Sequence, residues 1–150
     1  MIEGRQTRRA TVTWDGTLIE GSGRVSAGTS GTFSDLPVSW ASRTEAPAGR
    51  TSPEELLAAA HASCFSMAFS STLVKDGTPP RRLEVSATVT FAKDETRWSV
   101  VASHLEVRGW VDGSSQAAFA DAAERAKEGC PISRALKGNV ALSVAATLEE

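Results

Sequence analysis

The 150-residue sequence predicts an α+β fold dominated by antiparallel sheet. Segments that alternate apolar and polar residues, the pattern of half-buried strands, occupy both the N-terminal region and residues 83–111. Helical stretches follow groups of strands instead of following each strand, so the expected order is β-β-β-α-β-β-α-α-β. A chain of this length suffices for one hydrophobic core, and residues 1–150 are expected to form a single domain.

The N-terminal third is expected to contain short strands joined by turns. Residues 7–14 alternate in the manner of a strand, and Asp15-Gly16 then reads as a tight turn. Residues 17–34 are rich in Gly and Ser with short apolar pieces, which favours further short strands. Residues 35–50 contain prolines and a glycine, so this segment is expected to be a loop or a sheet edge.

A long apolar helix is expected to begin at Pro53 and to run to about Val74. Ser52 can cap it, proline suits the first helical position, and Glu55 completes a capping box. The sequence between its polar ends consists almost entirely of apolar or small residues, which is typical of a central buried helix.

The remaining chain is expected to form a hairpin, two helices and a last strand. Two alternating runs, 83–93 and 97–111, are separated by three polar residues and predict a β-hairpin. Residues 116–129 predict a helix, Cys130-Pro131 begins a short helix that stops at Gly138, and residues 139–148 predict a strand.

Composition sets broad limits on function. The net charge of −2 gives no general attraction to nucleic acid or membrane. No apolar stretch is expected to reach the roughly 20 residues that span a bilayer, and the N-terminus lacks an apolar signal core. A cytoplasmic protein is therefore expected. The opening MIEGR contains IEGR, a familiar linker sequence, and is given no structural weight.

The only two cysteines are the most informative residues. Cys64 lies within the long apolar helix and Cys130 lies at the start of the short helix. Two thiols that meet in a fold can react with an oxidant and then form a disulfide. In a reducing compartment a permanent structural disulfide is not expected, so a bond between these cysteines would be transient. A transient disulfide is typical of redox catalysis, and thiol redox chemistry is therefore the first hypothesis.

The segments around both cysteines resemble one family. SPEELLAAAHASCFSMAFS and AKEGCPISRAL, in this order and spacing, are similar to the osmotically inducible protein C and organic hydroperoxide resistance family (OsmC/Ohr), with the OsmC branch favoured. The resemblance covers nearly the whole chain. It implies a thiol-dependent peroxidase that reduces organic hydroperoxides. With only two histidines and two cysteines and no ligand-spaced set, no metal site is expected, and no other cofactor is expected either. The resemblance also implies an intertwined homodimer with sites at the subunit interface, regenerated by a dithiol of the dihydrolipoyl type.

The same resemblance assigns roles to individual residues. It implies that Cys64 is the peroxidatic cysteine, that Cys130 is the resolving one, and that Glu54 partners an arginine that activates the thiol. In the OsmC branch that arginine corresponds to Arg43, and in the Ohr branch Arg24 is the nearest candidate. Arg43 is favoured, and both stay open.

Helix geometry adds a hypothesis about the dimer. Glu54 and Cys64 are ten positions apart, which is about 15 Å of rise on a straight helix. One carboxylate cannot organise groups at that sulfur unless a long arginine bridges the gap. We therefore expect Glu54 to act on Cys64 of the other protomer.

Apolar residues near Cys64 suggest a substrate pocket, and two other functions are compatible with the sequence. Phe65, Met67 and Phe69, with Phe33, Leu36 or Trp40 from the preceding segment, are expected to line a pocket for an alkyl or acyl tail. One alternative is a non-catalytic binding or structural protein in which the thiols only pack. The other is a hydrolase that pairs Cys64 with His61, but no orienting Asp or Asn is found, and His61 is better explained by packing.

Overall fold

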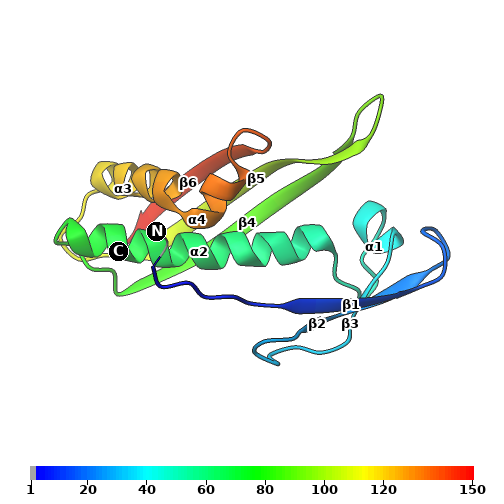
Figure 1. Cartoon of the computed structure of the whole chain (residues 1–150). Helices are drawn as coiled ribbons and strands as arrows, with labels where there is room; N and C mark the ends of the chain where they lie inside the picture. Colours follow the sequence, from blue (N-terminus) through cyan, green and yellow to red (C-terminus); the bar gives the residue numbers. More distant parts are fainter. Residues whose placement is uncertain (1–2) are drawn as a thin grey trace. The chain divides into compact units, whose positions relative to one another are not determined.

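The structure is a computed structural model that describes residues 3–150 (Figure 1). Met1 and Ile2, part of the opening MIEGR, lie outside the described residues. Contacts divide the chain into two compact units, an N-terminal unit that ends at Pro53 and a C-terminal unit, Glu54–Glu150. The single domain over residues 1–150 stays a prediction.

The N-terminal unit is a small antiparallel sheet with a short helix. Strands β1 (Ala10–Asp15), β2 (Ser22–Ala27) and β3 (Leu36–Val38) lie in the order β1-β2-β3. Helix α1 (Ala41–Thr44) follows. The segment that the sequence predicts as loop or edge therefore holds an edge strand and one helical turn.

The C-terminal unit is built on a second three-stranded sheet. Strands β4 (Arg82–Lys93) and β5 (Trp98–Trp110) form the predicted antiparallel hairpin. Strand β6 (Ala141–Glu149) pairs with β5 in parallel. Parallel pairing arises because the chain returns through two helices between these strands, as such crossovers require.

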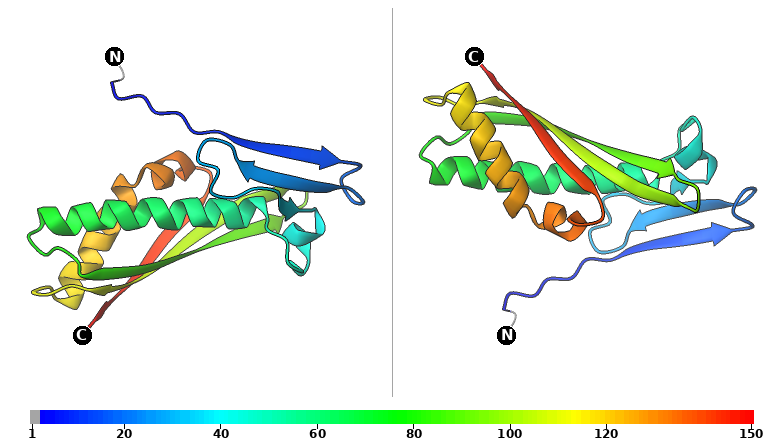
Figure 2. Two further views of the ribbon diagram at one scale, coloured as in Figure 1. Left: turned by 90° about the horizontal axis from the view of Figure 1, so that it is seen from below. Right: turned by 90° about the horizontal axis from the view of Figure 1, so that it is seen from above.

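The three helices of this unit confirm the sequence prediction. They are α2 (Pro53–Lys75), α3 (Gln116–Gly129) and α4 (Pro131–Leu136). Helix α2 ends as expected at Asp76-Gly77, because Gly77 adopts φ 82° and its N–H bonds the carbonyl of Val74. Figure 2 shows α2 running along the sheet of β4, β5 and β6.

The core of the C-terminal unit lies between α2, α3 and one face of β5. Phe69 packs against Phe65 and Phe119 with ring centroids 5.4 and 4.9 Å away. Gly109 on β5 makes room for the aromatic cluster, since a Cβ there would lie only 2.3 Å from Cζ of Phe119. Leu105 and Val107 complete the face of β5 that contacts both helices.

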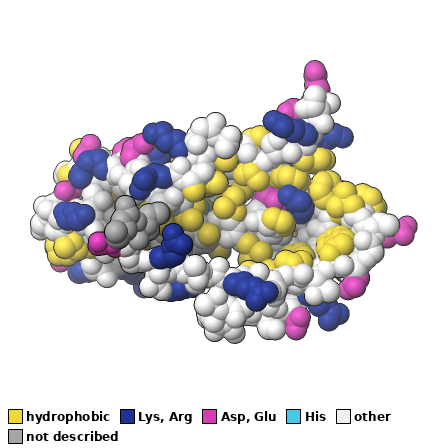
Figure 3. All heavy atoms as spheres, in the orientation of Figure 1, with side chains coloured by type: hydrophobic (Ala, Val, Ile, Leu, Met, Phe, Trp, Pro, Cys, Tyr) yellow, Lys and Arg dark blue, Asp and Glu magenta, His cyan; other side chains and the backbone are white. Residues whose placement is uncertain are grey.

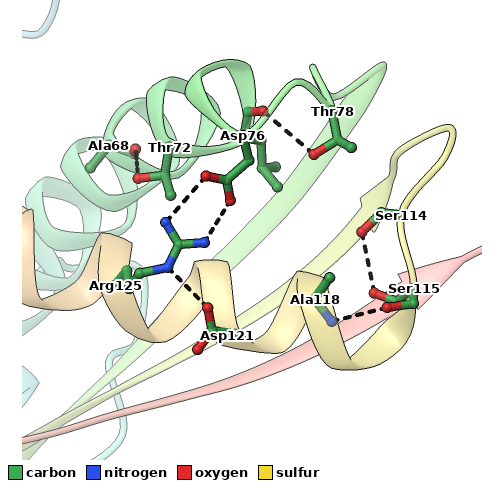
Figure 4. A network of polar contacts seen from close by, with 10 residues as sticks. Ala68, Thr72, Asp76, Thr78, Ser114, Ser115, Ala118, Asp121 and Arg125 are labelled. Atoms are coloured by element: carbon green, nitrogen blue, oxygen red, sulfur yellow. Dashed lines mark hydrogen bonds and ion pairs between the residues drawn. The ribbon is translucent and has the colours of Figure 1, made fainter.

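A salt-bridge cluster joins the C-terminal end of α2 to α3. Arg125 donates to both carboxylate oxygens of Asp76, at 3.3 and 2.5 Å, and to Asp121 at 3.0 Å (Figure 4). The side chains of Arg125, Asp76 and Asp121 are 50 %, 35 % and 71 % exposed, so the cluster contributes little to stability.

Helix α2 corrects one expectation about composition. Among the described residues it is the one helix that is long and apolar enough to cross a membrane by length and composition, with a mean hydropathy of 1.3 in its most apolar stretch. The prediction that no stretch reaches this length was wrong, because the Ala, Leu, Phe, Met and Val residues of this helix outweigh the polar serines among them. A core helix passes the same test, so the finding is weak evidence for a membrane.

Much of α2 nevertheless stays uncovered within one chain. Only 22 % of its most apolar stretch is buried, and the side chain of Met67 is 69 % exposed. Figure 3 shows hydrophobic side chains gathered over α2 on the face that it draws. The helix therefore buries one face in its own unit and leaves a second, mainly apolar face open, where Ala59, Ala60, Met67 and Val74 are exposed beside Ser63 and Ser71.

Candidate functional site

The two thiols meet inside the C-terminal unit, between α2 and α4. Cys64 lies in the middle of α2 and is half-buried, whereas Cys130 caps the N-terminal end of α4 and is fully buried. Their side chains lie within hydrogen-bonding reach of each other, and both cysteines are free thiols. Two residues 66 positions apart are thus brought together by the crossover from β5 to β6.

The surroundings of Cys64 favour the protonated thiol. Burial raises its pKa above the ordinary value, and the hydrogen bond and charge of Cys130 raise it further. The backbone N–H of Ile132, in the first turn of α4, donates to the Cys64 sulfur and opposes this rise. Because the net direction is upward, these neighbours alone do not generate a reactive thiolate at neutral pH.

His61 links the elements that carry the two cysteines. Its ring is fully buried; Nδ1 lies 2.6 Å from Oγ of Ser103 on β5, and Nε2 lies 2.8 Å from Oγ of Ser133 on α4. Burial lowers the pKa of this imidazole, so it stays neutral. Both ring nitrogens are engaged by serines, which speaks against His61 as the base of a thiol hydrolase and supports its expected packing role.

The predicted charged residues lie on different elements. Glu54 lies in the first turn of α2 and is 8 % exposed. Arg43 lies in the last turn of α1, where its guanidinium stacks over the Trp40 ring at 5.5 Å. Arg24 lies on β2 and is exposed. Both arginines belong to the N-terminal unit, so the roles of Arg43, Arg24 and Glu54 stay predictions.

The predicted substrate pocket is wrong in two of its residues. Phe65 and Phe69 are fully buried in the core, because they share the helix face of His61 and Leu73 at spacings of four residues. They cannot line a pocket for a substrate. Met67 lies on another face of α2 and remains available to a ligand.

Sequence reasoning missed three groups of this site: Ser103, Ser133 and the N–H of Ile132. Ser103 left a recognisable signal, because it occupies an inward position of the β5 alternation that otherwise carries apolar residues such as Leu105 and Val107. A polar residue there needs a buried partner. Within residues 3–150, no group of three or more His, Cys, Asp or Glu side chains is placed to hold a metal ion.

This fold and site define a class of protein: an α+β chain in which a central helix and a short crossover helix bring two free thiols together. Comparison with known proteins agrees. The family model described as OsmC-like protein matches residues 46–145. The chain therefore belongs to the OsmC-like family.

Individual relatives place it within that family. The chain is 36 % identical to the Peroxiredoxin OsmC of Escherichia coli strain K12, over 86 % of this chain and 89 % of that protein. It is 28 % identical to Organic hydroperoxide resistance protein-like 2 of Staphylococcus epidermidis, over 66 % and 69 %. These values favour the OsmC branch, as the sequence predicted.

A solved structure supports the fold. The organic hydroperoxide resistance protein OhrB of Bacillus subtilis matches with a TM-score of 0.70 and 26 % identity, over 94 % of this chain and 98 % of that one. The predicted α+β class of the OsmC type is confirmed.

Proposed function

We propose that this chain is a thiol-dependent peroxidase that reduces organic hydroperoxides to alcohols. The observation that carries the proposal is the contact of the Cys64 and Cys130 thiols inside one unit. Family membership and the printed names of the relatives, a peroxiredoxin and organic hydroperoxide resistance proteins, support the same reaction.

The proposed cycle uses both sulfurs. The Cys64 thiolate attacks the terminal peroxide oxygen, the O–O bond breaks, and the alkoxide leaves and takes up a proton as the alcohol. Cys64 is then a sulfenic acid. Cys130 attacks that sulfur, water leaves, and a Cys64–Cys130 disulfide forms. The electrons return when an external dithiol is oxidised to its own disulfide.

Activation of Cys64 requires a positive charge that its immediate neighbours do not supply. Burial and Cys130 both raise the pKa of Cys64, so a guanidinium near the sulfur is needed to favour the thiolate. We assign this role to Arg43, with Arg24 as the alternative. Glu54 is 8 % exposed, and a carboxylate buried to this degree needs a cation or several donors, which suits a bidentate pair with the arginine.

Reduction of the disulfide is expected to occur at Cys64. Cys130 is fully buried, and association with a second chain would only bury it further. Cys64 is only half-buried, so its sulfur is the more accessible of the two. The thiolate of the reductant, which we take to be a dithiol of the dihydrolipoyl type, attacks the Cys64 sulfur, and Cys130 leaves. The disulfide of N-acetylcysteine should therefore react with the Cys64 thiolate of a Cys130→Ser protein, giving a mixed disulfide on Cys64 and releasing one N-acetylcysteine. A mixed disulfide on Cys130 in the Cys64→Ser protein at a similar rate contradicts this order.

The active species is proposed to be a homodimer in the cytoplasm. The apolar open face of α2 is suited to cover by a second copy of the chain. Glu54 is proposed to serve Cys64 of the other protomer. Mixed dimers of Cys64→Ala and Glu54→Ala chains test this, because one working site returns if the groups act across the dimer and none returns if they act within one chain.

The direct test is peroxidase activity with a dithiol reductant. Cumene hydroperoxide should be consumed by the native protein, faster than hydrogen peroxide is, and Cys64→Ser should abolish the reaction. The raised pKa of Cys64 favours one competing function, a non-catalytic binding or structural protein of the same fold. In that case the thiols react with the hydroperoxide no faster than free cysteine does.

A further inference from the structure

A buried polar cluster of His61, Ser103 and Ser133 joins three elements of the C-terminal unit. His61 and Ser103 are 0 % exposed and Ser133 is 2 % exposed. The imidazole on α2 binds one serine on β5 and one on α4, at 2.6 and 2.8 Å. Buried polar groups are costly without partners, so each member depends on the others.

The contact with Ser133 connects the helical turns that carry the two cysteines. His61 lies one turn before Cys64 on α2, and Ser133 lies three residues after Cys130 in α4. Helix α4 has only six residues, and a helix of this length does not hold its conformation without tertiary contacts. Ile132 of the same turn donates its N–H to the Cys64 sulfur.

We propose that His61 is a positioning residue for the thiol pair: through Ser133 it fixes the first turn of α4 so that Cys130 and the N–H of Ile132 both face the Cys64 sulfur. The contact with Ser103 anchors the same imidazole to the sheet and does not touch α4. The consequence for catalysis, faster formation of the disulfide, rests on the proposed peroxidase function.

The positioning itself can be measured without any peroxide. In a glutathione buffer the two thiols of the protein reduce one oxidised glutathione, giving the Cys64–Cys130 disulfide and two reduced glutathione molecules. The buffer composition at half oxidation gives the effective concentration of one thiol at the other. A change that destabilises the reduced and oxidised proteins equally leaves this quantity unchanged.

Two serine variants form a matched pair. Ser133→Ala and Ser103→Ala each remove one buried oxygen and one hydrogen bond from the same ring. Ser133→Ala should lower the effective concentration about tenfold or more, which corresponds to a shift of about 30 mV. Ser103→Ala should change it less than about twofold, since the tie to α4 remains. Thermal melts establish that both variants are folded at the assay temperature.

Two results would overturn the proposal. Equal losses in both variants would show that the cluster only stabilises the fold, and an unchanged value for Ser133→Ala would show that α4 needs no such tie. If the native protein shows the expected pairing but consumes no hydroperoxide, the proposed function fails and the positioning role stands.

A measurement on the native chain gives an independent check if Ser133→Ala does not fold. The N–H groups of Arg134 and Lys137 donate to carbonyls of Cys130 and Ser133 at 2.9 Å. If His61 holds α4, these amides should exchange with deuterium at least about 100-fold more slowly than unstructured peptide. Exchange at the unstructured rate, with α2 still protected, contradicts the proposal.

Discussion

The free energy of unfolding is predicted to fall in mildly acidic solution because of His61. Burial holds the pKa of its imidazole below the ordinary value of 6.5, to which it returns in the unfolded chain. The unfolded state therefore binds more protons below that pH. The contribution of the neutral imidazole to the free energy of unfolding is fully present above pH 6.5. It is lost as the pH falls from 6.5 toward the lower pKa that His61 has in the folded protein.

The size of the effect has an upper limit set by one proton. If the folded imidazole takes up no proton, the free energy of unfolding falls by about 1.4 kcal/mol between about pH 7.5 and about pH 5.5. With a urea dependence of about 2 kcal/mol per molar, the unfolding midpoint shifts by about 0.7 M. The assay is urea denaturation at fixed protein concentration, because a dimer makes the midpoint concentration-dependent.

A His61→Gln variant is the control, because it retains His104 and every carboxylate but cannot titrate at position 61. The difference in pH dependence between the native protein and this variant isolates the buried imidazole. The reasoning is refuted if both proteins lose the same stability over this range, or if the native protein gains stability in acid.

Three further predictions concern packing, activation and specificity. Gly109→Ala should lower the free energy of unfolding by about 1–3 kcal/mol, because its Cβ overlaps a buried ring, whereas Gly129→Ala should not; equal melting temperatures contradict this. Arg43→Ala should raise the pH midpoint of Cys64 alkylation by iodoacetamide, and the same shift in Arg24→Ala instead reassigns the activator. Hydroperoxides with long alkyl chains should be reduced faster than tert-butyl hydroperoxide, and equal rates argue against an apolar pocket.

Much of the C-terminal unit could be predicted from the sequence because its signals are local. The proline and acidic residues that begin α2, the alternation of β4 and β5, and Cys130-Pro131 before α4 all fix their elements by short-range rules. The parallel pairing of β6 with β5 was not foreseen, since strand pairing across a crossover depends on contacts distant in the chain.

The site was predictable only in part for the same reason. The two cysteines could be singled out because the chain has only two and both lie in distinctive segments. Their contact could not be derived from local sequence, because it depends on how the fold brings α2 and α4 together. Phe65 and Phe69 were assigned to a pocket because both neighbour Cys64 in sequence, although the helix turns their side chains fully into the core, against which Cys64 itself packs only in part. The partners of His61 come from β5 and α4, and no local pattern connects them.

The most direct test of the account is the fate of the two thiols in a single turnover. Reduced protein is treated with one equivalent of cumene hydroperoxide, free thiols are counted, and the protein is digested with trypsin without reduction. The account predicts loss of two thiols per chain and a disulfide between the peptides 51–75 and 128–134, which contain Cys64 and Cys130. Recovery of both thiols, or oxidation of each cysteine separately without a link between these peptides, contradicts it.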